Sequence, residues 1–148
     1  MTQAELAMIH LRNAGAFQPA PRLYGFAQSV SDQLQIWPGM ISATHWQLGN
    51  SSRVDGAEFH VDKGGELGHI HLNGDIHLAL TKGLRDRLIA LELARPFRWS
   101  DAWVTAPITS PQEADQALWL FRLGYDRLCS TPEETLFVRI ALHAKQTD

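Results

Sequence analysis

Three short segments separated by glycine-containing turns constrain this chain more than any other feature. They cover residues 57–62, 67–72 and 75–80, and apolar and polar side chains largely alternate along each of them. Alternation with a period of two is typical of β-strands that bury one face. Because the connections are short, consecutive strands must run antiparallel. The sequence therefore predicts an antiparallel sheet with one apolar face and one polar face.

The turn between the second and third strands predicts their register. A two-residue turn at the Asn-Gly pair would mix apolar and polar side chains on both faces. A three-residue turn, Leu72-Asn73-Gly74, instead pairs Ile70 with Ile76 and His69 with His77. We expect the three-residue turn, because it collects the apolar side chains on one face.

The turn between the first and second strands is predicted by the same criterion. A two-residue Gly64-Gly65 turn pairs His60 with His69 and places Glu58 across from His71. This register also sends the apolar side chains of the first strand to the face that the other two strands bury. We therefore expect the Gly-Gly pair to form the turn.

The polar face of the predicted sheet collects histidines and carboxylates. Cross-strand neighbours have Cβ atoms about 4.5–5.5 Å apart, which is close enough for two imidazoles to share an ion. Zinc binds histidine nitrogens and carboxylates, and a carboxylate can also orient a histidine or act as a general base. His69, His71 and Glu58 are the candidate metal ligands. The candidate ligand-binding residues are Glu58, His60, His69, His71, Asp75 and His77.

Several interpretations of this face stay open at the level of the sequence. It can be a solvated sheet face, a site for a small ligand or for proton transfer, or a metal site. In another class of function, the face or a sheet edge joins two copies of a non-enzymatic interaction module. An apolar rim would favour such a homodimer, and a concave pocket would favour a small-molecule ligand. The residues assign no catalytic group, no firm metal, no cofactor and no substrate.

Helices and two further strands are expected around these three segments. Apolar residues recur every three or four positions, and the pairs Ser110-Pro111 and Thr131-Pro132 are typical helix starts. Helices are expected at about 3–13 and 24–36, after the capping residue Thr81, and from Ser110 to near Gly124. The C-terminal tail is also expected to be helical, and a strand is the alternative there. The further strands are 40–48 and 102–108, the latter placed by Pro107 at an edge or ending there.

The fold class that follows is α+β. We expect one domain over residues 1–148, with a small antiparallel sheet of about five strands and helices packed mainly on one face. The length of 148 residues fits a single domain and suffices for a core without disulfides.

Charge and composition exclude several classes of protein. The formal net charge is −3 and no Lys/Arg cluster occurs, so we expect no nucleic-acid partner. The first ten residues lack the basic and apolar stretches of a signal peptide, and no apolar run reaches the roughly 20 residues of a membrane span. The single cysteine, Cys129, excludes an internal disulfide and a cysteine zinc site. We expect a cytoplasmic protein without a membrane partner.

The part of the chain from about 37 to 125 resembles the luciferase-domain family, a family of small α+β domains of unknown function. The resemblance rests on Trp37-Pro38-Gly39, Trp103-Val104 and the stretches "EFHV", "ELGHIHLNGDIHLAL", "LRDRLI" and "LFRLGYDRL". It implies an α+β domain but brings no established reaction and no catalytic residues. The family's name does not imply light emission here, because no feature indicates a luciferin or flavin site.

The chain departs from the family's pattern at one place. Similar sequences tend to carry a histidine in the segment where this chain reads Arg95-Pro96-Phe97. If that histidine belongs to the family's site, the resemblance implies that the site is altered or absent in this chain.

Overall fold

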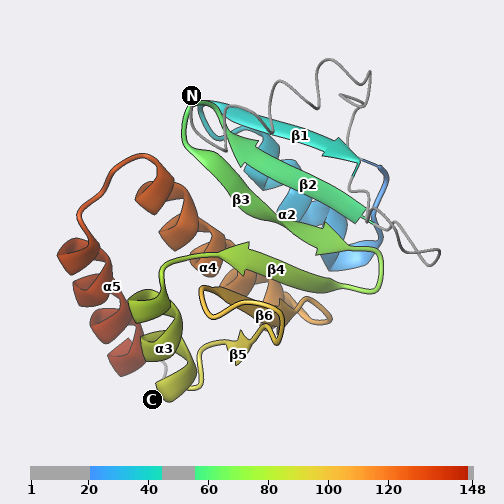
Figure 1. Ribbon diagram of the computed structural model, residues 1–148. Helices are drawn as coiled ribbons and strands as arrows, with labels where there is room; N and C mark the ends of the chain where they lie inside the picture. The colour runs from blue at the N-terminus through green and yellow to red at the C-terminus, as the bar shows by residue number, and fades with distance from the viewer. Residues whose placement is uncertain (1–20, 45–55, 147–148) are drawn as a thin grey trace.

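The computed structural model describes residues 21–44 and 56–146, which form four helices and one six-stranded sheet (Figure 1). The expected helix at 3–13 and residues 45–48 of the expected strand 40–48 lie outside the described residues. In chain order the elements are α2 (Gly25–Gln35), β1 (Met40–Thr44), β2 (Gly56–Val61), β3 (Gly65–His71), β4 (Asp75–Ala79), α3 (Lys82–Ala90), β5 (Arg95–Pro96), β6 (Trp103–Pro107), α4 (Pro111–Leu128) and α5 (Glu133–Gln146).

The sheet is antiparallel and its strand order is β1-β2-β3-β4-β6-β5. The α+β class is confirmed, with six strands in place of about five. The additional strand is β5, whose two residues are too few to show any periodicity in the sequence. Because β5 pairs with the outer side of β6, β6 is an inner strand of the sheet. Pro107 lies at the end of β6, opposite Asp75, where its missing amide donor interrupts no further pairing.

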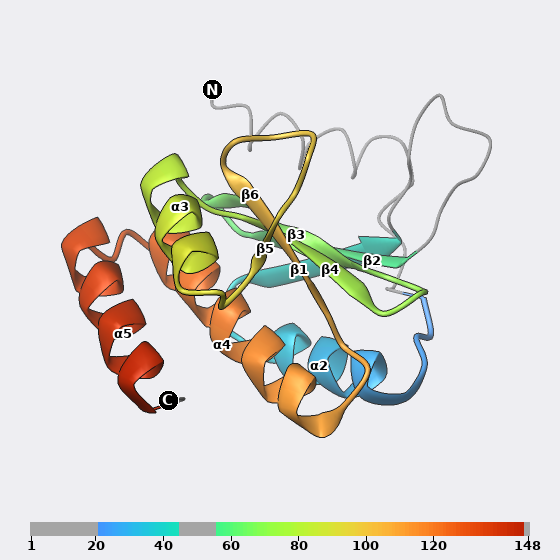
Figure 2. The ribbon, with the colours of Figure 1, turned by 90° about the horizontal axis from the view of Figure 1, so that it is seen from below.

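Two helices cover one face of the sheet. Figure 2 shows α2 and α4 on the same side, with the connection between β5 and β6 rising on the other side. Helix α4 contacts β3, β4 and β6, and α2 contacts β1 and α4. Their contact with the sheet buries Phe59, Ile70, Ile76 and Leu78 completely. The helices therefore bury the apolar face and leave the histidine face on the opposite side.

The helix starts confirm the expected caps. The Thr81 hydroxyl accepts a hydrogen bond from the Leu84 amide at the start of α3, and the Ser110 hydroxyl accepts one from the Glu113 amide at the start of α4. The Glu113 carboxylate in turn accepts a hydrogen bond from the Thr109 amide at 2.8 Å. These side chains satisfy amide groups that have no partner within the helix.

The end expected for α4 is wrong, and the reason lies in the packing. The helix continues through Gly124 to Leu128. A Cβ atom on Gly124 would lie 2.9 Å from the Cδ1 atoms of both Leu67 and Leu78, closer than carbon atoms pack. The glycine thus permits close approach of α4 to the sheet and does not end the helix. The tail is helical, as α5, and the strand alternative is wrong.

In the described ranges, 21–44 and 56–146, none of the helices combines the length and the apolar character needed to cross a membrane.

A candidate metal centre on the polar face of the sheet

The sheet register brings most of the polar residues of β2, β3 and β4 to one face. His69 pairs with His77 in the next strand and with Glu58 in the preceding strand. His71 and His60 lie two residues from these positions along their own strands and therefore share the face. The three-residue turn at 72–74 is confirmed, and its Gly74 amide donates to the His71 carbonyl at 3.0 Å.

The expected register between β2 and β3 is wrong. The turn occupies residues 62–64 and not Gly64-Gly65, so Glu58 lies opposite His69 and His60 lies opposite Glu66. The pairing also shifts by one residue between Phe59 and His60. Phe59 pairs with Gly68 but His60 pairs with Glu66, so Leu67 has no partner in the strand ladder. This is a β-bulge, which places one extra residue in one strand.

The bulge decides which side chains reach the polar face. Glu66 and His69 are three residues apart, so in a regular strand they would point to opposite faces. With the bulge both lie on the histidine face, while Leu67 is fully buried in the core. Gly68 permits this conformation, because its φ is +152° and a Cβ atom there would lie 2.2 Å from the His77 carbonyl oxygen.

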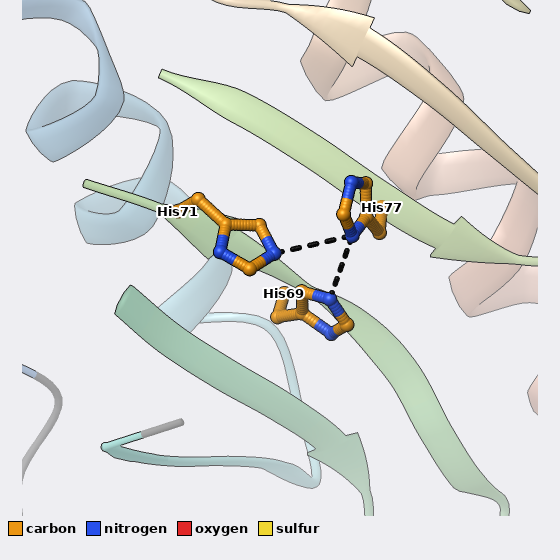
Figure 3. Close-up of side chains that lie close together, drawn as sticks. All are labelled: His69, His71 and His77. Carbon is orange, nitrogen blue, oxygen red and sulfur yellow. Dashed lines mark hydrogen bonds between the residues drawn. The ribbon is translucent and has the colours of Figure 1, made fainter. Parts of the chain in front are cut away.

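Three imidazole rings converge on this face. In Figure 3, the rings of His69 and His71 from β3 and His77 from β4 point toward one another. His69 Nε2 lies 2.9 Å from His77 Nδ1, and His71 Nε2 lies 3.1 Å from the same atom. One ring nitrogen from each histidine lies within 4.8 Å of the other two. His69 is buried and the other two rings are half-buried.

Hydrogen bonding alone does not account well for this arrangement. A ring nitrogen of a neutral histidine carries either one proton or one lone pair in the plane of the ring. His77 Nδ1 can therefore make one good hydrogen bond, yet two ring nitrogens approach it at hydrogen-bonding distance. A cation placed between the rings would accept a lone pair from each of the three nitrogens.

A second group of ligand atoms lies on the other side of the His69 ring. His69 Nδ1 is 3.7 Å from Glu66 Oε1, and one ligand atom each of Glu58, Glu66 and His69 lies within 4.8 Å of the others. His60 Nε2 lies 3.1 Å from Glu58 Oε2, and the His60 side chain is 4% exposed. His69 thus belongs to both groups, with one ring nitrogen directed at each.

Aromatic rings border the three histidines on the side of β5 and β6. The ring centroid of Phe97 lies 4.4 Å from that of His77, and the centroid of Trp103 lies 5.6 Å from that of His69. Phe97 and Trp103 are also 6.0 Å apart. These rings limit the access of water to the imidazoles from that side.

Asp75 and His143 have other surroundings. Asp75 lies at the start of β4, where its amide donates to the Asn73 side chain at 2.9 Å, and it is in neither group of candidate ligands. Far from the sheet face, His143 of α5 stacks on Trp119, with ring centroids 3.8 Å apart and planes 12° apart. Burial holds the pKa of His143 below its usual value of 6.5.

Sequence reasoning missed three residues of this region. The expected Gly64-Gly65 turn places Glu66 directly after the turn, and alternation alone does not predict the bulge that turns Glu66 toward His69. Phe97 follows the short strand β5, and its contact with His77 depends on the pairing of Arg95 with Thr105. The position of Trp103 could be predicted from the sequence, because Trp103 lies next to Val104 in the expected strand 102–108. Val104 is buried in the core, so the side chain of Trp103 points to the opposite, polar face.

A cavity of about 430 Å³ lies at the edge of the sheet. Its walls come from the end of α3, from β5 and β6, and from the start of α4, and they include Arg95, Thr105 and Gln116. Thr105 is the cross-strand partner of His77, but none of the three histidines lines the cavity. The cavity and the histidine cluster are therefore separate features of neighbouring strands.

Together, the fold and the cluster define a small α+β domain with a histidine-lined sheet face. The family model described as the luciferase domain matches residues 64–124. The resemblance read from the sequence is thus confirmed for this segment, which contains all three converging histidines. No curated protein and no solved structure matches the chain.

Proposed function

We propose that this protein binds a divalent transition-metal ion through His69 Nε2, His71 Nε2 and His77 Nδ1, and that the ion presents an open coordination position to a small ligand or water. The observation that carries the proposal is the approach of two ring nitrogens to one nitrogen of His77, at 2.9 and 3.1 Å. Ligand nitrogens on a tetrahedral zinc ion are about 3.3 Å apart, given Zn–N distances of about 2.0–2.1 Å. The two distances to His77 Nδ1 are only a few tenths of an ångström shorter than this value.

The choice of ion follows from the ligand atoms. Three neutral imidazoles suit zinc, nickel, copper or cobalt, whereas magnesium and calcium prefer shells of oxygen ligands. The burial of His69 and the packing of Phe97 against His77 restrict ring movement. Rings that are already held in place lose little conformational entropy when the ion binds.

Three protein ligands leave at least one position on the ion for water or for a ligand atom. An ion in this position would polarise that group and lower the pKa of a bound water, which supplies a nucleophile or a base near neutral pH. The water or ligand atom on the ion would itself be the acid or base, since the carboxylates of Glu58 and Glu66 lie on the other side of the His69 ring. Metal-assisted acid/base chemistry on a small ligand is therefore the reaction class that this site supports best.

Calorimetric titration with zinc tests the proposal on metal-free protein at neutral pH. We expect saturable binding by the native chain, and a loss of affinity in His71→Ala that exceeds the roughly 10–100-fold typical of losing an outer-shell partner. His71 is half-buried on the polar face, so its replacement opens no core cavity. Equal heats for the native chain and His71→Ala would leave the proposal without support.

His143→Ala is the matched control for adventitious binding. It also removes one half-buried imidazole, but His143 lies on α5 and stacks on Trp119. Zinc binding by this variant should equal that of the native chain. A loss of affinity in both variants would mean that the measured zinc is not held by the three-histidine cluster.

A further inference from the structure

The Glu58–Glu66–His69 group, on the other side of the His69 ring, has the composition of a second cation site. We propose that a second divalent cation binds there, and that His69 bridges the two ions through its two ring nitrogens. This inference rests on the proposed function only in that the first ion occupies His69 Nε2. The second ion would be held by His69 Nδ1 and one carboxylate oxygen from each glutamate.

The distance between His69 and Glu66 favours an ion over a direct hydrogen bond. His69 Nδ1 and Glu66 Oε1 are 3.7 Å apart, which is longer than a hydrogen bond. Two ligands of one metal ion, each about 2.0–2.2 Å from it, are separated by roughly 3–4 Å. The observed distance therefore matches two ligands on either side of an ion.

The burial and the charge of the two glutamates also favour a bound cation. The side chain of Glu58 is 16% exposed and that of Glu66 is 34% exposed. Ligand oxygens of both lie within 4.8 Å of each other and of His69. Bringing two carboxylates this close in a partly buried place is unfavourable unless positive charge lies near them. A divalent cation supplies that charge and uses the oxygens as ligands.

His60 lies next to the Glu58 carboxylate of the same site. Its Nε2 lies 3.1 Å from Glu58 Oε2, and the ring is almost fully buried. An outer partner of this kind fixes the orientation of a ligating carboxylate. His60 is thus a positioning residue for Glu58, and we do not assign it as a ligand.

Formation of the His69 bridge between two ions releases one proton. A neutral imidazole carries one ring proton. When His69 Nε2 binds the first ion, this proton resides on Nδ1. Binding of the second ion at Nδ1 displaces the proton to the solvent, so the second site should fill with release of one proton per chain. The two ions, on either side of one imidazole, would lie roughly 6 Å apart.

Zinc stoichiometry measured on four proteins tests the inference. Metal-free native protein, Glu58→Gln/Glu66→Gln, His71→Ala/His77→Ala and His69→Ala would be dialysed against buffered zinc at neutral pH, and bound zinc would be measured by elemental analysis. We expect two ions per native chain, one in each double variant, and none in His69→Ala. Glutamine keeps the shape of glutamate and still offers His60 an acceptor, and circular dichroism checks that each variant is folded.

The possible results separate the two proposals. One ion per native chain that persists in Glu58→Gln/Glu66→Gln would overturn the second site and keep the first. One ion that is lost from that variant but retained by His71→Ala/His77→Ala would keep the second site and overturn the proposed function. No zinc on the native chain would overturn both.

Proton release provides an independent readout. Calorimetry in two buffers with different ionisation enthalpies gives the number of protons released per chain on saturation with zinc. The native chain should release one proton more than Glu58→Gln/Glu66→Gln. Equal release by the two proteins would contradict the bridging role of His69.

Discussion

The ring of Phe97 lies against the ring of His77, with centroids 4.4 Å apart and planes tilted by 40°. This contact joins the outermost strand of the sheet to the histidine cluster. It exists because β5 pairs with β6 and β6 pairs with β4, so a residue just beyond β5 reaches a ring two strands away. Replacement of Phe97 therefore tests whether the strand pairing at the β5 edge holds the His77 ring in place.

Replacement of Phe97 with alanine should weaken zinc binding by about 10-fold, the size of effect expected when a partner that holds a ligand ring is lost. Without the phenyl ring, water reaches the His77 imidazole and the ring gains rotational freedom. Calorimetric titration measures the change. Trp99→Ala is the control, because Trp99 lies in the same connection but is 71% exposed, and it should leave zinc affinity unchanged.

Gly68→Ala should destabilise the fold by about 2–4 kcal/mol, in the range of strong overpacking and backbone strain. The added Cβ would lie 2.2 Å from the His77 carbonyl oxygen at a φ of +152°. Urea unfolding measures the free energy. In Gly83→Ala, at the start of α3, the nearest atoms would be 3.3 and 3.4 Å away in side chains, so we expect a change of less than about 1 kcal/mol. Similar losses in both variants would argue against the bulge.

Tyr125→Phe should cost about 1 kcal/mol at neutral pH, because the Tyr125 hydroxyl donates a hydrogen bond to the Pro38 carbonyl. Burial raises the pKa of Tyr125 above its usual value of 10.0. The stability that this group contributes is complete below pH 10.0 and is lost as the pH rises from there through the folded-state pKa. Urea unfolding at pH 7 and above pH 10 should show a smaller alkaline loss in Tyr125→Phe than in the native chain.

His143 should titrate below pH 6.5, because burial disfavours its charged form. Its contribution to stability is present above pH 6.5 and is lost as the pH falls through its folded-state pKa. NMR titration of the imidazole signals gives the pKa directly, with His143→Gln to assign the signal. A pKa at or above 6.5 would contradict the burial of the ring between Trp119 and Gln116.

Much of the local structure was predictable because it depends on neighbours in the chain. The caps at Thr81 and Ser110 follow from side chains that satisfy amides within one turn. The three-residue turn at 72–74 follows from the requirement that Ile70 and Ile76 share the buried face. These choices involve residues close in sequence, so the pattern alone constrains them.

The register of β2 against β3 was not predictable in this way. Both the expected and the observed registers bury apolar side chains from each strand, so the alternation does not distinguish them. The observed register depends on a bulge at Leu67-Gly68, and this bulge lets Leu67 pack against Gly124 of a helix more than fifty residues away. Only packing between distant segments selects it.

The sequence by itself determined that histidines of two neighbouring strands share one polar face, because side-chain alternation and one short turn require it. Only the tertiary structure decided that Glu66 and Phe97 join them. The bulge turned Glu66 toward His69, and the pairing of β5 with β6 laid Phe97 on His77. The physical reason is that alternation is a local property of the backbone, whereas bulges and edge-strand pairing are fixed by the fit of side chains between a sheet and the helix that covers it.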